Sequence, residues 1–303
     1  MALTFREIRP GAPKSNPFTI AIVANPVLEA PWNSGAVIAD PIMGSLPIFQ
    51  AAAAYIDSSL FGGLPGQREA VLADPTIATA IRVVSLFDDT LPVVLGNALA
   101  AQDGSSFTLV ARRSGFRAFL AQYPQFHIQT DVVYAVSASP THTRASAWFT
   151  SDDDAQPGVP FTLDGNAFLH RFYNLIPGTI AIPANSTSLT AIHEFGHAIS
   201  SYTNGAIVDL YVDSNPGLNN KRGRPIPAVF ANYSGTTLAS DLTRDGLGYP
   251  GSWSSYHCEL VDPTCPAVMD NYWLSRSGSV TCQHDRITRQ YILDRVRAKA
   301  GRP

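Results

Sequence analysis

The chain has 303 residues, of which 45% are hydrophobic and 15% are charged, and its formal net charge is −3. This composition excludes a wholly disordered chain, and the length allows one large domain or two modest ones with a buried core. The basic residues are scattered, which is not typical of a nucleic-acid-binding protein, and no apolar run approaches the roughly 20 residues that cross a bilayer. We therefore expect neither nucleic acid nor a membrane among the partners.

The first third of the chain is predicted to contain two buried strands around one long helix. Residues 1–17 are expected to form a loose N-terminal arm, and the β-branched run Phe18–Ala24 a buried strand. Ser45 can cap a helix that stops near Gly62. A second strand is predicted at Ile81–Phe87.

Three further strands and a second long helix follow. Alternating segments at Asp131–Ser137 and Ala145–Thr150 are predicted to be strands joined by a turn. Gly178–Pro183 reads as a short apolar strand placed at an edge, because Pro183 cannot donate to a ladder. A helix is predicted from Leu189 to about Tyr202, ended by the turn at Asn204 and Gly205.

The last hundred residues are predicted to be irregular until a terminal helix at Asp285–Ala300. On that helix we expect Tyr291, Ile292 and Val296 to face inward and the arginines, Arg295 among them, to face largely outward. The order of elements predicts an α+β fold with two lobes. A mixed sheet with helices would form the N-terminal lobe, 18–205, and an irregular, helix-ended segment the C-terminal lobe, 206–303.

The cysteines and the N-terminus give little indication of compartment. An odd count, Cys258, Cys265 and Cys282, allows at most one disulfide, and their spacing lacks the paired C-x2-C of a zinc knuckle. One disulfide or three inert thiols is therefore the favoured interpretation. The first ten residues show no apolar core or cleavage site, so we expect no signal peptide. The triplet 152–154 lacks the spaced ligands of a calcium loop.

The motif that carries chemistry is His193-Glu194-Phe195-Gly196-His197, an H-E-x-x-H sequence on the predicted helix. Residues four apart lie on one helix face, so His193 and His197 can reach one Zn²⁺. Glu194 is placed to act as general base toward a metal-activated water and to pass the proton to the leaving amine. The alternative is a buried helix with two satisfied histidines, but the motif rarely arises by chance in a chain with so few His and Glu residues.

Zinc in a hydrolase needs a third protein ligand and an open position for water. The predicted turn at Gly205 would let the chain swing back under the helix, and Asp209 is the first carboxylate after it. We expect Asp209 to be the third ligand. Asp213 and His257 remain alternatives.

These residues resemble the zincin metallopeptidases. The helix, preceded by a short apolar strand at Thr179–Ile182, is similar to their active-site helix and to the edge strand that pairs with extended substrate. The segment Cys265–Tyr272 resembles the Met-turn of metzincins, in which the methionine, here Met269, packs beneath the metal. The resemblance implies that Tyr272 stabilises the oxyanion, although it follows Met269 by three residues rather than two.

The chain departs from the metzincin pattern after the second histidine. Ser200 stands at the expected glycine position and Thr203 at the expected ligand position. An aspartate third ligand at longer spacing is more similar to the aspzincins, whose G-T-x-D motif the segment from Gly205 to Asp209 follows loosely.

The sequence thus predicts a zinc-dependent endopeptidase that acts on proteins or peptides. Two alternatives stay open. One is a zinc hydrolase of another amide, such as a cell-wall or narrow effector substrate. The other is a catalytically inert, metal-stabilised binding module, against which the intact Glu194 argues, because a structural site needs no base there.

Overall fold

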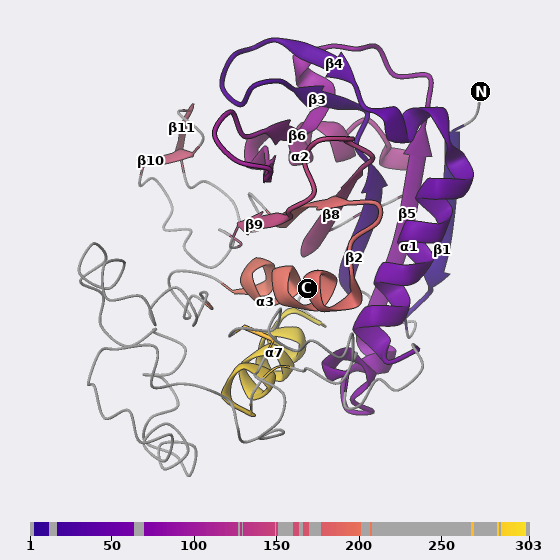
Figure 1. Ribbon diagram of the computed structural model, residues 1–303. Helices are drawn as coiled ribbons and strands as arrows, with labels where there is room; N and C mark the ends of the chain where they lie inside the picture. The colour runs from indigo at the N-terminus through magenta and orange to yellow at the C-terminus, as the bar shows by residue number, and fades with distance from the viewer. Residues whose placement is uncertain are drawn as a thin grey trace.

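The computed structural model describes residues 3–11, 17–63, 70–126, 128, 130–148, 150, 160–163, 166–169, 177–200, 207, 268–269, 284 and 286–300. These residues form an α+β fold with two mixed β-sheets and few helices, which confirms the predicted class (Figure 1). Several predicted residues lie outside the described part of the chain, as does most of 206–303: Asp209, Asp213, His257, Tyr272, the three cysteines and the 152–154 triplet.

The larger sheet has six strands in the order β1-β5-β2-β8-β12-β9. The four central strands are parallel to one another, and β1 and β9 run antiparallel to them at the two edges. In sheet order the bounds are β1 (Leu3–Arg9), β5 (Ile81–Asp88), β2 (Phe18–Ala24), β8 (Val132–Ser137), β12 (Gly178–Pro183) and β9 (Ser146–Trp148).

The central strands are predominantly apolar because the sheet is buried on both faces, as parallel sheets usually are. Every residue of β2, β8 and β12 is buried. One face packs against α1 (Leu46–Phe61), α3 (Ser188–Ile199) and α7 (Arg286–Lys299), and the other against α2 (Arg113–Leu120) and the smaller sheet. The helix α1 begins at the predicted cap, Ser45, and ends at Gly62 in the left-handed conformation, with φ of 77°.

Three sequence-based expectations about strands are wrong. Part of the arm expected to be loose is the strand β1, which pairs with β5 more than seventy residues away. The strands β8 and β9 do not form a hairpin, because β12 is inserted between them. For the same reason β12 is not an edge strand: its Pro183 lies at the end of the ladder with β8, where the missing N–H is tolerated, and β9 is the edge.

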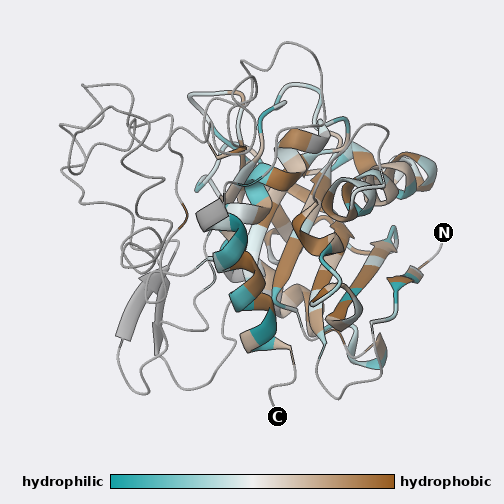
Figure 2. Ribbon diagram, turned by 90° about the horizontal axis from the view of Figure 1, so that it is seen from below, coloured by the Kyte–Doolittle hydropathy of each residue, from teal (hydrophilic) through white to brown (hydrophobic). Residues whose placement is uncertain are grey.

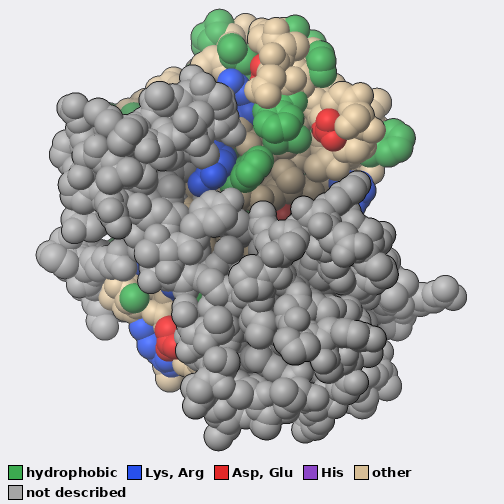
Figure 3. Space-filling view, turned by 90° about the vertical axis from the view of Figure 1, so that its left-hand side faces the viewer, with side chains coloured by type: hydrophobic (Ala, Val, Ile, Leu, Met, Phe, Trp, Pro, Cys, Tyr) green, Lys and Arg blue, Asp and Glu red, His purple; other side chains and the backbone are tan. Residues whose placement is uncertain are grey.

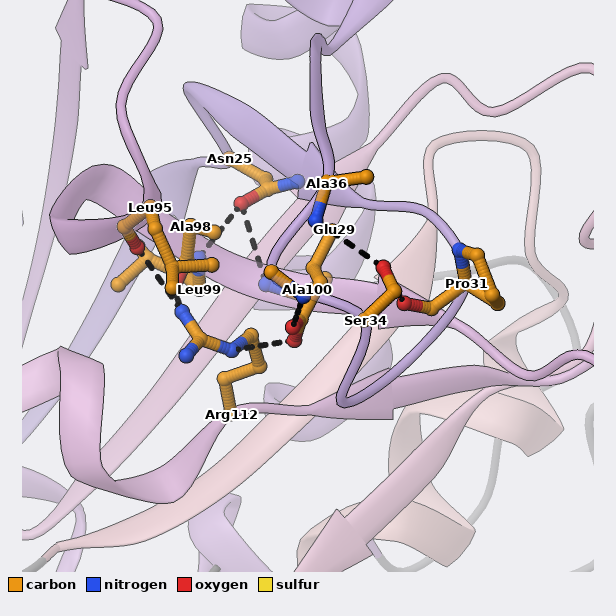
Figure 4. Close-up of polar contacts among 11 residues, drawn as sticks. Asn25, Glu29, Pro31, Ser34, Ala36, Leu95, Ala98, Leu99, Ala100 and Arg112 are labelled. Atoms are coloured by element: carbon orange, nitrogen blue, oxygen red, sulfur yellow. Dashed lines mark hydrogen bonds and ion pairs between the residues drawn. The ribbon is translucent and has the colours of Figure 1, made fainter.

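The smaller sheet is held to the ends of β2 and β8 by buried polar side chains (Figure 4). It has the order β4-β3-β6-β7, with bounds Val37–Ala39, Val27–Glu29, Ala98–Gln102 and Leu109–Ala111. The side-chain carbonyl of Asn25 accepts hydrogen bonds from the backbone N–H groups of Leu99 and Ala100, at 3.0 and 3.2 Å. The buried Glu29 carboxylate forms a 2.9 Å ion pair with Arg112.

Asp40 joins this network from the other side of Asn25. Its carboxylate accepts from the Asn25 amide at 2.8 Å and from the backbone N–H groups of Ile42 and Ala138 at 2.9 and 3.0 Å. Burial raises the pKa of Asp40 above its ordinary value, although these hydrogen bonds oppose the shift. The network therefore fixes the carboxyl ends of the parallel strands β2 and β8.

The C-terminal helix α7 packs beneath α3, and Figure 2 shows its turns alternating between hydrophilic and hydrophobic residues. Tyr291, Ile292 and Val296 face inward, as predicted. Arg295 does not face outward. It is buried, because its guanidinium reaches the Ile199 carbonyl at the end of α3, at 3.4 Å.

The remaining described elements are short. A two-stranded sheet pairs β10 (Pro160–Leu163) with β11 (Asn166–Leu169), and 3-10 turns lie at Pro41–Gly44, Val71–Ala73, Ala78–Ala80, Leu95–Asn97 and Pro124–Phe126. Figure 3 shows hydrophobic side chains on the upper part of one face, where the smaller sheet lies. None of the described helices is long and apolar enough to cross a bilayer.

Candidate metal centre

The H-E-x-x-H motif lies on α3, which begins and ends at identifiable caps. The Thr187 side chain accepts from the Thr190 N–H at 3.3 Å, and Ser200 closes the C-terminal end through its own N–H. The helix therefore ends at Ile199, three residues earlier than expected. It lies so close to β12 that a β-carbon at Gly178 would overlap the Ala198 carbonyl.

Each histidine of the motif donates through Nδ1 to a backbone carbonyl from another segment. His193 Nδ1 lies 2.7 Å from the Val268 oxygen, and His197 Nδ1 lies 2.8 Å from the Ile207 oxygen. A carbonyl oxygen can only accept, so both Nδ1 atoms carry the proton. In neutral imidazoles this assignment leaves a lone pair on each Nε2.

The two Nε2 atoms face each other at 3.2 Å, with the rings nearly perpendicular at 88°. Two lone pairs at that distance repel unless a proton or a metal cation lies between them. Two nitrogens at about 2.0–2.1 Å from a tetrahedral zinc are about 3.3 Å apart, which is close to the separation seen. Zinc-ligating histidines usually donate their other ring N–H to a carbonyl or a carboxylate, as both rings do here. The donor set and its spacing therefore fit a zinc ion.

Glu194 is buried beside the pair, with 7% of its surface exposed. On an α-helix it projects about 100° from His193, while Gly196 projects to the opposite side of the histidine face. The Glu194 charge also reaches Tyr134 on β8: burial, and after it this charge, raises the pKa of the Tyr134 phenol. The Glu194 carboxylate thus lies within electrostatic range of the Tyr134 phenol on the sheet.

Ser200, the residue after α3, is hydrogen-bonded both to the helix and to Ile207. Its hydroxyl donates to the His197 carbonyl at 2.8 Å and accepts from the Ile207 N–H at 3.0 Å. This bridge holds Ile207 where its own carbonyl meets the His197 imidazole. Ile207 is also part of the main hydrophobic core.

The opposite flank of the motif is occupied by Met269 and His284. A β-carbon at Gly196 would lie 2.8 Å from the Met269 sulfur and 2.8 Å from Cε1 of the His284 ring. Both side chains are buried. Burial, followed by the proximity of His193, lowers the pKa of His284 to about 3, so its ring is neutral at physiological pH.

The structure brings together three of the five predicted site residues, His193, Glu194 and His197. Within the described residues, no group of three His, Cys, Asp or Glu side chains is arranged to hold a metal. Asp209 and Tyr272 lie outside that part of the chain, so their roles stay predictions.

Sequence reasoning missed the carbonyls of Val268 and Ile207 and the buried ring of His284. Backbone carbonyls have no sequence signal, and His284 is an isolated histidine just ahead of the terminal helix. The glycine in H-E-F-G-H was the one available signal that something packs closely there. No protein-family model matches the chain, and no curated protein or solved structure is significantly similar to it.

Proposed function

We propose that the protein is a zinc-dependent endopeptidase with a two-lobed, zincin-like form. The observation that carries the proposal is the facing pair of Nε2 lone pairs on His193 and His197, each ring oriented by a backbone carbonyl. Zn²⁺ bound there would polarise a scissile carbonyl and lower the pKa of a bound water. The residues of the chain supply the other steps.

Glu194 is the general base. Its position next to His193 in sequence and its burial support this role, since a carboxylate beside a metal-bound water could take a proton as that water attacks the scissile carbonyl. The same carboxylate then returns the proton to the amine that leaves as the peptide bond breaks. Tyr272 is the proposed oxyanion stabiliser, on the resemblance of Cys265–Tyr272 to a Met-turn alone.

Asp209 is the proposed third ligand. The return of the chain to α3 at Ile207 supports it, because Asp209 follows by two residues, a reach of about 7 Å at most. Asp213 and His257 are the competing ligands. The test compares the zinc affinities of three variants, Asp209→Ala, Asp213→Ala and His257→Ala. The third ligand is the residue whose replacement weakens zinc binding most.

An extended peptide is the proposed substrate, paired with the edge strand β9. The backbone N–H groups of Gly178 and Ala184 donate to carbonyls of the β8 segment, at 2.9 and 2.8 Å. Because the backbone polar groups of successive residues point to opposite sides of a strand, those of Thr179 and Ala181 point toward β9. Their partners Trp148 and Ser146 are then bonded to β12. The N–H and C=O of Ala147 therefore point away from the sheet, where a substrate strand can pair with them.

Two other functions remain in competition. A zinc hydrolase of a different amide would use the same residues, and only substrate screening distinguishes it. A metal-stabilised binding module would hold zinc and cleave nothing. The intact Glu194 of the motif favours an enzyme, because a structural metal site needs no general base at that position.

The test compares wild type with Glu194→Ala and with the control His142→Ala. In wild type the His142 ring is hydrogen-bonded to the Asp103 carbonyl, far from the motif in sequence. We expect chelator-sensitive cleavage of casein or a peptide library by wild type and control. Glu194→Ala should keep its zinc and lose nearly all cleavage. Activity that survives this substitution would contradict the mechanism, and stoichiometric zinc without cleavage of any substrate would favour the binding module.

A further inference from the structure

His284 is the buried polar side chain near the motif that the proposed chemistry does not use. It is 3% exposed, and neither ring nitrogen makes a hydrogen bond with regular geometry among the described residues. Burying an imidazole without full hydrogen bonding is energetically unfavourable. An apolar side chain of similar size would avoid that cost, so the ring calls for an explanation.

The ring lies against the bare backbone of the motif helix. Its Cε1 approaches Gly196, and the Ile192 carbonyl, one residue before His193, is near enough to favour ring protonation. In a regular helix the Gly196 N–H donates to the Ile192 carbonyl, so the two residues close one hydrogen-bonded turn. His284 therefore contacts the turn of α3 that carries His193 and Glu194.

Met269 lies against the same glycine. Its sulfur approaches the space above Gly196 as closely as the His284 ring does. The residue before it, Val268, accepts the Nδ1 proton of His193. The sulfur and the imidazole thus both pack on the motif helix at Gly196, on one flank of the histidine pair, and Met269 is joined in sequence to the residue whose carbonyl orients His193.

We propose that His284 is a positioning residue: seated on Gly196 beside Met269, its imidazole fixes the motif turn of α3 against the Val268 carbonyl and so sets the facing geometry of His193 and His197. The inference rests on the proposed function in that the pair is taken to bind a metal. The role proposed for His284 is to position the motif helix rather than to bind the metal.

The first experiment measures Co²⁺ binding and the visible spectrum of the bound cobalt in wild type, His284→Ala and His284→Gln. Loss of an outer-shell partner typically weakens metal affinity by 10–100-fold, and we expect about that loss, with a changed spectrum, for His284→Ala. Glutamine keeps a polar group of similar reach, so we expect it to recover much of the affinity. The control His142→Gln should behave as wild type.

The second experiment records the tautomers of His193 and His197 by ¹⁵N NMR in the metal-free protein, which separates this inference from the proposed function. We expect Nδ1-protonated rings in wild type and a mixture of tautomers in His284→Ala. If wild type binds no cobalt, the proposed function fails, but the tautomers still decide the role of His284. Unchanged tautomers in a folded His284→Ala, or unchanged cobalt affinity and spectrum, would overturn the positioning role.

Discussion

Gly178 at the start of β12 lies directly against the carbonyl of Ala198 in the last turn of α3, with no room for a β-carbon between them. This contact sets the depth at which the motif helix rests on the sheet. Gly178→Ala should push the helix away and lower the free energy of unfolding by about 1–3 kcal/mol, as overpacking typically does. Gly96→Ala is the matched control, because nothing lies within 4 Å of a β-carbon there. Equal unfolding midpoints in urea for the two variants would contradict this close packing.

The Asn25–Asp40 pair allows a sharper test, by exchange of the two residues. In Asp40→Asn an amide would face the Asn25 amide, and in Asn25→Asp a carboxylate would face the Asp40 carboxylate. Each single change should cost about 1–3 kcal/mol through unmet or repelling groups. The double variant Asn25→Asp with Asp40→Asn restores one donor facing one acceptor while the backbone donors of Leu99 and Ile42 keep their acceptors. We expect it to be more stable than either single variant in denaturant unfolding, and additive losses would refute the assigned network.

The proposed pairing of substrate with β9 depends on the backbone N–H of Ala147. Ala147→Pro removes that donor, and an edge strand tolerates proline where the N–H faces away from the sheet. We expect Ala147→Pro to fold and bind zinc as wild type does, with a raised KM for peptide cleavage. An unchanged KM would exclude this edge as the binding strand, and a misfolded variant would show that the N–H instead belongs to the sheet.

The docking of α7 should depend on pH through Asp74. Its hydrogen bond with Thr76 and, after it, the charge of Arg289 at 3.1 Å hold the pKa of Asp74 below its ordinary value of 3.8. A carboxylate with a lowered pKa stabilises the fold above pH 3.8, and this contribution is lost as the pH falls through the lowered value. Asp74→Asn should therefore cost up to about 1 kcal/mol at neutral pH and nothing at the acid end, since the pair is partly exposed.

A double-mutant cycle with Arg289→Gln is the control for this pair. If the two groups act together, the second substitution should add little to the first. A difference between Asp74→Asn and wild type that persists unchanged once the pH is low enough to protonate Asp74 fully would contradict the assignment.

The elements that could be predicted from sequence are those specified by local signals. The β-branched run of β2, the cap at Ser45 and the glycine at the end of α1 each act within a few residues, and the structure has all three. The H-E-x-x-H spacing likewise places its two imidazoles together, because helix geometry alone determines it.

The expectations that failed depend on partners distant in sequence. The polar strand β1 is ordered by its ladder with β5, and β12 is interior because β9 returns to cover its edge. Arg295 is buried because the Ile199 carbonyl meets it from another helix. No local pattern contains such information, and the same holds for the ring of His284 beneath Gly196.

The central claim is that His193 and His197 hold a metal. It is tested most directly by titrating the metal-free protein with zinc in a calorimeter and then measuring the metal content of the dialysed sample. We predict one tightly bound zinc per chain in wild type and in Glu194→Ala. His193→Ala and His197→Ala should each bind at least about 100-fold more weakly, a larger loss than an outer-shell change produces. A wild-type protein that binds no zinc, or histidine variants that bind it as tightly as wild type, would contradict the account.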